Sequence, residues 1–349
     1  MKRILLKYNL LILMLLVVQL LIAGDLEEKK KTINKSFKIS SSTELKVSNE
    51  FGEVEINSWE KQELKVDIEI IVNGRNESRA YDLLDRIEID IRESSGEVSF
   101  ETEFDGGMNT RGDESFKVNY KISLPASNQI TVKNKFGDTY IDHRSGKSFI
   151  DVSYGSLKTE DFEGYLELEL SFGKGYLGRT KKSEIEVKYS DLEMDNADEM
   201  EMEQQFSDVS LENVNTLKLE SKYGKMEIGE AGKVDCDVQF SGFDIERINE
   251  SLYMEANYVS DFELQSLNKD FSFVKFYGKF STFELNIEDG TKADLEAEFS
   301  FARMNSSLDM DVYYKVKEDN RSEYKARIGG GDPNKKIVVK SSYGDFRIR

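Results

Sequence analysis

The chain has few of the residues that cross-link a fold, interrupt regular structure or carry catalysis. Its 349 residues include one cysteine, two prolines, one histidine and one tryptophan. Cys236 has no second cysteine to pair with, so no intramolecular disulfide can form and stability must come from core packing. The lone His143 excludes a histidine cluster, and no nucleophile elbow, phosphate-binding glycine loop or Cys/His metal spacing is present. The sequence therefore predicts a protein that is not an enzyme.

Basic residues are also in deficit. The chain carries 48 Lys and Arg against 67 Asp and Glu, which gives a net charge of −19. Such a surface repels nucleic acid and anionic lipid and attracts cations or basic partners. We therefore expect no nucleic-acid partner.

Long apolar runs are absent except at the N-terminus. Lys2, Arg3 and Lys7 precede an apolar run over 10–22, and Ala23-Gly24 supplies small residues before Asp25. This pattern is typical of a secretory signal peptide over 1–24, and an uncleaved anchor is the alternative. We expect an exported protein with no integral membrane segment after signal cleavage. No cysteine follows the signal closely enough to accept a lipid.

An aromatic residue followed by a small residue recurs at a nearly constant interval of 17 or 18 positions. The regular copies are Phe136-Gly137, Tyr154-Gly155, Phe172-Gly173, Tyr189-Ser190, Phe206-Ser207, Tyr223-Gly224 and Phe240-Ser241. Tyr258, Phe280 and Phe299 continue the series less regularly, with outlying copies at Phe51-Gly52 and Tyr343-Gly344. A fixed period of this length indicates one supersecondary unit that is stacked many times.

The residues around each aromatic alternate as in strands with one buried face. Apolar or small residues lie six, four and two positions before the aromatic and three and five positions after it. Each unit is therefore a strand, a sharp bend, a second strand and a turn. A meander of antiparallel hairpins is the competing interpretation, but it needs turn dipeptides such as Asn-Gly or Asp-Gly between most strands, and few are present, among them Asp105-Gly106 and Asp289-Gly290. We predict a mainly β fold, a right-handed β-solenoid of roughly a dozen coils, each as long as the interval between the aromatics.

The segment between Phe51 and Phe136 breaks the period. Strand alternation over 63–72 is followed by an amphipathic helix over 78–87 and by strands near 89–103 and 116–124. We predict an α+β N-terminal cap with the first coil over 25–125, then the solenoid over 126–349. Its C-terminal cap is expected near 308–349, because an open last coil would expose unpaired backbone groups.

Two segments carry a resemblance to a known family. The segment from Leu124-Pro125 through Ile130-Thr-Val-Lys-Asn-Lys-Phe136-Gly-Asp-Thr-Tyr-Ile141, and the earlier Asn49-Glu-Phe51-Gly-Glu-Val-Glu-Ile56, resemble the bacterial putative adhesin family of exported envelope proteins. The resemblance covers most of 40–349, although Ser190, Ser207 and Ser241 depart from the glycine of the motif. It implies a β-helical exported protein of a Gram-negative bacterium, in the periplasm or at the cell surface. It supplies no catalytic residues.

Carboxylates recur three positions before the aromatics and form the candidate site. If the coils stack in register, the acidic ladder Glu169, Glu186, Glu203, Glu220 and Asp237 lies on one sheet with like charges one strand apart. Either the ladder binds a divalent cation such as calcium or a basic partner, or it is a solvated face softened by Lys188, Lys218 and Lys222. We expect no cofactor apart from such a cation.

The predicted function is that of a rigid scaffold or adhesin-like binding surface. Its partner would be a protein or glycan ligand on the cell envelope or a host surface. Two alternatives remain open: a carbohydrate-active β-helix enzyme and a periplasmic sensory or regulatory partner protein. Folds of this kind host several functions, so the repeat alone does not choose between them.

Overall fold

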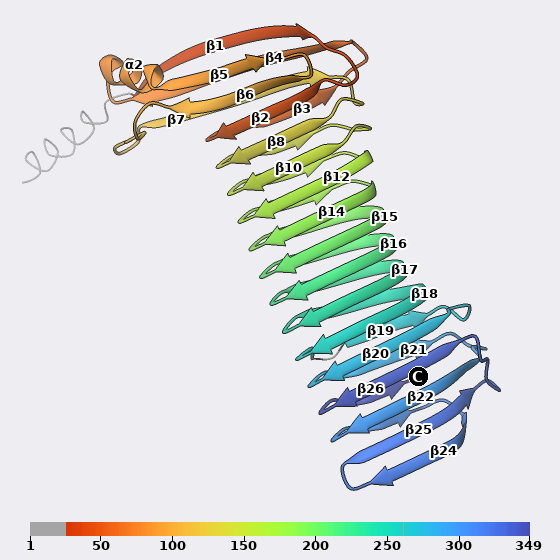
Figure 1. Ribbon diagram of the computed structural model, residues 1–349. Helices are drawn as coiled ribbons and strands as arrows, with labels where there is room; N and C mark the ends of the chain where they lie inside the picture. The colour runs from red at the N-terminus through yellow and green to blue at the C-terminus, as the bar shows by residue number, and fades with distance from the viewer. Residues whose placement is uncertain (1–25, 261) are drawn as a thin grey trace, which may run out of the picture.

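The computed structural model describes residues 26–260 and 262–349, so the predicted signal segment lies outside the described residues. The described chain is mainly β, with one helix and a β-solenoid of about nine turns of about 18 residues each. Figure 1 shows the coils stacked as a long column with additional strands at both ends. The solenoid prediction is confirmed, whereas the expected dozen coils were too many because several strands at the ends are antiparallel additions.

Two parallel sheets form the sides of the column and meet at the aromatic corner. The first sheet, whose strands precede the aromatic, runs in the order β2 (Glu44–Glu50), β8 (Ile130–Lys135), β10 (Ser148–Ser153), β12 (Phe162–Ser171), β14 (Thr180–Lys188), β15 (Asp191–Gln205), β16 (Asp208–Lys222), β17 (Lys225–Gln239), β18 (Gly242–Asn257) and β20 (Phe273–Lys279). The second sheet contains β3 (Val54–Ser58), β9 (Thr139–Ile141), β11 (Ser156–Thr159), β13 (Lys174–Leu177), the first halves of β15 to β18, β19 (Phe262–Leu267) and β21 (Phe283–Ile287). Because β15 to β18 continue around the far corner, they belong to both sheets.

Each aromatic residue at the corner adopts a left-handed backbone conformation. Twelve aromatic residues have φ between 51° and 62°: Phe51, Phe136, Tyr154, Phe172, Tyr189, Phe206, Tyr223, Phe240, Tyr258, Phe280, Phe301 and Tyr343. This conformation is uncommon for a bulky residue, and it turns the chain so that the inward positions shift by one after the bend. The corner residue near 300 is Phe301, so the prediction of Phe299 was wrong; Phe299 is buried in β22 (Ala293–Ser300).

The residue after each aromatic is small because successive coils approach closely there. A Cβ atom on Gly137 would lie 1.8 Å from the carbonyl oxygen of Gly52, and one on Gly155 would lie 2.0 Å from that of Gly137. In the serine coils the hydroxyl group instead accepts a hydrogen bond from the coil before, as when Gly173 N donates to Ser190 Oγ at 3.0 Å. Glycine and serine therefore both allow successive coils to meet at this position, glycine by close backbone approach and serine by a hydrogen bond.

The inward positions fill the column with apolar side chains. Leu168, Ile185, Met202, Leu219 and Cys236 lie side by side on successive strands of the first sheet and are all buried. Cys236 is thus a core residue, and burial raises the pKa of its thiol well above its usual value. Asn49 Nδ2 donates to Asn134 Oδ1 at 3.2 Å, so a pair of buried amides joins two neighbouring coils.

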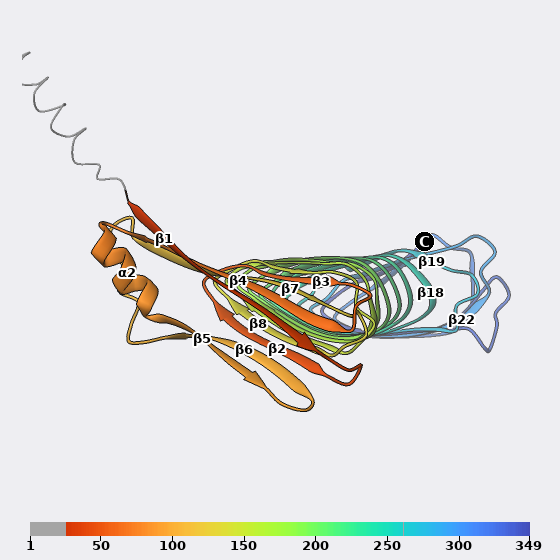
Figure 2. The ribbon, with the colours of Figure 1, turned by 90° about the horizontal axis from the view of Figure 1, so that it is seen from above.

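At the N-terminal end two strands pair in parallel with the first coil, and further antiparallel strands and the helix are added to them. Its strands β2 and β3 pair with β8 and β9, although the whole cap separates the two pairs in the sequence. The added elements are β1 (Glu27–Lys38), β4 (Glu63–Gly74), α2 (Glu77–Asp85), β5 (Ile87–Glu93), β6 (Glu97–Phe104) and β7 (Ser115–Leu124). The helix begins one residue earlier than predicted because Asn76 Oδ1 accepts a hydrogen bond from Arg79 N. Figure 2 shows α2 beside the end of the column, next to β1.

At the other end the last coil of the chain is inserted into the column. Its strands are β26 (Lys336–Ser342) and β27 (Phe346–Ile348), and β26 pairs in parallel with β20 on one side and β22 on the other. The end of the column is formed by β22, β23 (Met304–Ser306) and the antiparallel hairpin of β24 (Met310–Glu318) and β25 (Arg321–Ile328). The copy at Tyr343 therefore lies between those at Phe280 and Phe301, as Figure 1 shows by the position of β26.

Candidate functional site

The acidic ladder predicted from the sequence lies in register on the outer face of the first sheet. Glu169 pairs with Glu186, Glu186 with Glu203, Glu203 with Glu220 and Glu220 with Asp237 on successive parallel strands. Burial and the charges of Asp151, Glu186 and Glu167 raise the pKa of Glu169.

Lysines offset part of this repulsion. Lys188 forms an ion pair with Glu186, Lys218 Nζ lies 3.4 Å from Glu201 Oε2, and Lys222 Nζ lies 3.5 Å from Glu220 Oε2. In the described part of the chain, the carboxylate group compact enough to hold a metal ion is Asp90, Glu101 and Glu103 on β5 and β6, and no ladder residue belongs to it. The ladder is therefore an extended charged surface.

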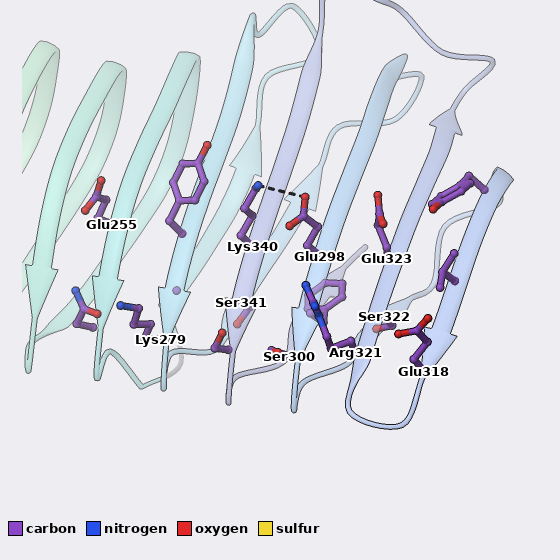
Figure 3. A pocket seen from close by; sticks show the side chains of 17 residues that line it. Glu255, Lys279, Glu298, Ser300, Glu318, Arg321, Ser322, Glu323, Lys340 and Ser341 are labelled. Carbon is purple, nitrogen blue, oxygen red and sulfur yellow. Dashed lines mark ion pairs between the residues drawn. The ribbon is translucent and has the colours of Figure 1, made fainter.

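The ladder column continues into a groove at the C-terminal end of the same sheet. Beyond Asp237 the register runs through Glu255, Tyr277, Lys340, Glu298 and Glu323. The groove has a volume of about 760 Å³ and crosses six strands, β18, β20, β26, β22, β25 and β24. Figure 3 shows its side chains standing on neighbouring strands, with Lys340, Glu298 and Glu323 in succession.

Both signs of charge and two tyrosines line this groove. Lys340 Nζ lies 3.2 Å from Glu298 Oε1, the ion pair drawn in Figure 3. Lys279 and Arg321 lie on one flank of the groove, Glu255, Glu318 and Glu323 also line it, and Tyr277 and Tyr314 add aromatic surface. A concave surface with a few charged and aromatic groups is the usual form of a ligand site.

Two neighbouring strands of this region carry lysines without carboxylates. We define the lysine–aromatic strip as the outward side chains Phe273, Lys275, Tyr277 and Lys279 of β20 and Lys336 and Lys340 of β26. The sequence does not reveal this strip, because its two strands are distant in the sequence and only the insertion of β26 beside β20 brings them together.

The structure also brings together ionisable groups at the far corner that the sequence interpretation did not single out. Arg144 is fully buried, and its guanidinium donates to Ser58 Oγ at 3.1 Å and to Asn128 O at 2.6 Å. Burial lowers the pKa of Arg144 to about 10. Nearby, a hydrogen bond and the charge of Asp142 raise the pKa of Glu160.

This corner group lies apart from the groove over β18, β20, β26, β22, β25 and β24. His143 lies half-buried beside it, and its backbone N donates to Asp142 Oδ1 at 2.8 Å. The side chains of this group contact the loops between coils, so they hold successive corners together.

No family model and no curated protein matches the chain. Solved structures that align with it include a putative cell adhesion protein from Clostridium sporogenes, at 13% identity over 92% of this chain and 99% of that one, with a TM-score of 0.22. A putative adhesin from Parabacteroides distasonis aligns at 12% identity over 74% of this chain and 93% of that one, with a TM-score of 0.34. A putative lipid binding protein from the same organism aligns at 10% identity over 91% and 97% of the two chains, with a TM-score of 0.33.

The names of these solved structures agree with the adhesin resemblance noted in the sequence. With TM-scores below 0.5 and identities of 10–13%, none of these likenesses decides the fold or the function of this chain. Among the described residues, no helix has the length and apolarity that a membrane crossing requires.

Proposed function

We propose that this protein is an exported binding scaffold, in which the solenoid holds a ligand site at its C-terminal end. The observation that carries the proposal is the groove over β18, β20, β26, β22, β25 and β24, which combines concavity, both charges and aromatic surface. The sheet beneath it is held by continuous parallel pairing from β18 through β20 and β26 to β22, so the lining side chains keep a constant spacing. The ligand would be a protein or a glycan of the cell envelope or of a host surface.

Retention of the purified chain on immobilised cell envelopes and on matrix-coated plates tests this function. Lys340→Glu removes the pairing with Glu298 and places three carboxylates in a row, so we expect retention to fall on the order of tenfold. Lys158→Glu changes the net charge equally on β11 of the opposite sheet and serves as the matched control. Equal losses for the two variants, or none, would exclude the groove as the ligand site.

Export and cellular location form the second part of the proposal. The signal pattern over 1–24 and the adhesin resemblance support export to the periplasm or the surface of a Gram-negative cell. A tag inserted at Asn320, in the turn between β24 and β25, would be reached by antibody in intact cells if the protein is displayed. Access only after the outer membrane is broken would favour a periplasmic scaffold or regulatory partner.

The division of the chain into a cap over 25–125 and a solenoid over 126–349 stays a prediction, as does cation binding by the acidic ladder. Calcium titration followed by thermal melting tests the latter. A rise in Tm at millimolar calcium that is lost in Glu203→Gln would support binding by the ladder. An unchanged Tm would leave the ladder as a solvated face.

The carbohydrate-active enzyme alternative predicts the release of reducing ends from envelope polysaccharides. It would need an acid and a base that flank a bound glycosidic bond. In the groove, the carboxylates of Glu298 and Glu323 lie on adjacent paired strands with Lys340 beside one of them. Because these two carboxylates stand side by side on one sheet and do not flank a bound glycosidic bond, we expect no hydrolysis of envelope polysaccharides.

A further inference from the structure

The lysine–aromatic strip forms a regular pattern of charge and apolar surface. Parallel pairing of β20 with β26 places Phe273 opposite Lys336, Lys275 opposite Val338, Tyr277 opposite Lys340 and Lys279 opposite Ser342. Each of these four levels therefore holds one ammonium group, and the first three also hold one apolar or aromatic side chain. Successive levels are two residues apart, which is about 6.6 Å along a strand.

The strip is positively charged, whereas the molecule as a whole is negatively charged. The chain carries −19, yet neither β20 nor β26 contains a carboxylate. Lys340 pairs with Glu298, but in the described ranges no carboxylate oxygen lies within 4 Å of the amino groups of Lys275, Lys279 or Lys336. Unpaired cations in a row attract an anionic ligand and bind it with charge-assisted contacts.

Carboxylates limit the strip on both sides. Glu255 on β18 pairs with Tyr277 of the strip, and Glu296 and Glu298 on β22 pair with Val338 and Lys340. An anionic chain that crossed the strands would meet these carboxylates, so it must run along β20 and β26. A polymer with a high charge density would also be repelled by the acidic faces around the strip.

The aromatic rings of the strip differ from those of the corner. Corner rings such as Phe206 are stacked on both faces by their neighbours, with centroids 4.9–5.0 Å apart. Tyr277 instead meets Tyr253 in a tilted contact at 5.6 Å, and Phe273 is covered by Lys275 Nζ at 4.9 Å from its centroid. These half-exposed rings offer apolar surface to a ligand that has both an apolar face and an anionic group.

We propose that the lysine–aromatic strip binds an acidic polysaccharide, which runs along β20 and β26. Sugar rings would lay an apolar face on Phe273, Val338 or Tyr277, and their carboxylates would pair with the neighbouring lysines of the strip. The bound polysaccharide would then reach the groove, because Tyr277, Lys279 and Lys340 belong to both the strip and the groove. This inference rests on the proposed function and names the ligand class of the same region.

Fluorescence anisotropy with labelled polygalacturonate oligosaccharides at low salt tests the proposal on the full chain. We expect saturable binding that weakens on the order of tenfold in the double variant Lys275→Gln with Lys336→Gln, since two charge-assisted contacts are lost. The control is Lys158→Gln with Lys181→Gln, two exposed lysines on β11 and β14 with the same change in net charge. Lys275→Arg with Lys336→Arg should restore binding.

Three parallel probes identify the ligand class: neutral maltooligosaccharides, polyglutamate and single-stranded DNA. Weak or absent binding of all three, together with a several-fold loss of polygalacturonate binding in Tyr277→Leu, supports the proposal. Absence of polygalacturonate binding, an equal loss in the control variant, or tighter binding of polyglutamate or DNA would overturn it. If polygalacturonate fails while retention on envelopes still depends on Lys340, only the polysaccharide assignment falls and the binding function stands.

Discussion

The corner aromatics hold a backbone conformation that bulky residues rarely adopt. Each ring contacts the rings of the coils above and below, at centroid distances of 4.8–5.2 Å in the coils from Tyr154 to Phe280. The left-handed conformation costs a residue with a Cβ about 1–2 kcal/mol, whereas stacked aromatic pairs contribute about 0.5–1.5 kcal/mol each. Because each ring has two neighbours, stacking offsets the backbone cost.

Phe206 provides a direct test of this balance. Phe206→Ala removes both ring contacts and keeps the positive φ, so we expect a loss of about 1–3 kcal/mol in unfolding free energy. Phe206→Gly removes the same contacts but also the steric cost, so it should be about 1 kcal/mol more stable than the alanine variant. Urea denaturation of both variants measures the difference. If the alanine variant is as stable as the glycine variant or more stable, the positive φ carries no steric cost and the explanation is wrong.

Asn134 is a buried polar residue whose bonds join neighbouring segments. Its Nδ2 donates to Gly52 O at 3.1 Å and to Asp138 O at 3.0 Å, and its Oδ1 accepts from Asn49. Asn134→Leu leaves these buried groups without partners, and we expect it to destabilise the chain by about 2–4 kcal/mol. Lys158→Leu, at an exposed position of β11, should change stability by less than about 0.5 kcal/mol in the same urea titration. A difference below about 1 kcal/mol between the two variants would show that the amide bonds contribute little.

Among the strands, the in-register stacking of like residues has opposite effects on the two faces of the sheet. Inside, it aligns Leu168, Ile185 and Met202 so that apolar surfaces meet. Outside, the same register aligns Glu169, Glu186 and Glu203, and their mutual repulsion opposes folding. Of these two effects, only the repulsion on the outer face depends on pH and salt.

Glu169 allows the repulsion to be measured by pH. Because burial and the neighbouring carboxylates raise its pKa, the folded chain binds this proton more tightly than the unfolded chain does. Its contribution to stability is therefore fully present below the unfolded pKa and is lost as the pH rises through the folded pKa. We expect the wild type to gain stability relative to Glu169→Gln when the pH falls from neutral to below the ordinary glutamate range.

The control for this pH series is Glu163→Gln, at an exposed site outside the ladder. Unfolding free energies of the three proteins across the pH range give the comparison. High salt should reduce the effect of Glu169→Gln, since exposed charges are screened. Parallel pH profiles of the wild type and Glu169→Gln would contradict the assignment.

In the molecule as a whole, stability is distributed along the column. Each coil contacts mainly the coils beside it, so local damage should spread only to its neighbours. The inserted last coil is an exception in sequence terms, because β26 joins β20 to β22 and thereby connects the end of the chain to segments that come much earlier.

Truncation after Gly331 tests this connection. It removes β26 and β27, so β22 to β25 lose their attachment to the column and the groove is lost. We expect hydrogen exchange to show lost protection in β20 to β25, while β10 to β17 stay protected. Loss of protection throughout the column would mean that the molecule unfolds as a single unit. The full chain with a tag at Asn320 is the control.

The repeated coil, its inward and outward faces and the register of the acidic ladder could all be predicted from the amino-acid sequence. These features follow from the short local period, because a strand alternation and an aromatic corner recur at fixed offsets. The local pattern also predicts the helix to within one residue at its start, with the Asn76 cap as the detail it missed.

The order of the coils at the C-terminal end, and with it the groove and the strip, depends instead on contacts between distant segments. The offsets around Tyr343 identify a coil, but they do not tell which coils it lies between. That choice depends on how the side chains of β26 pack against β20 and β22, which no local pattern records. The same limit explains the error at Phe299: alternation marked an inward aromatic of β22, and only the left-handed backbone of Phe301 showed where the chain turns.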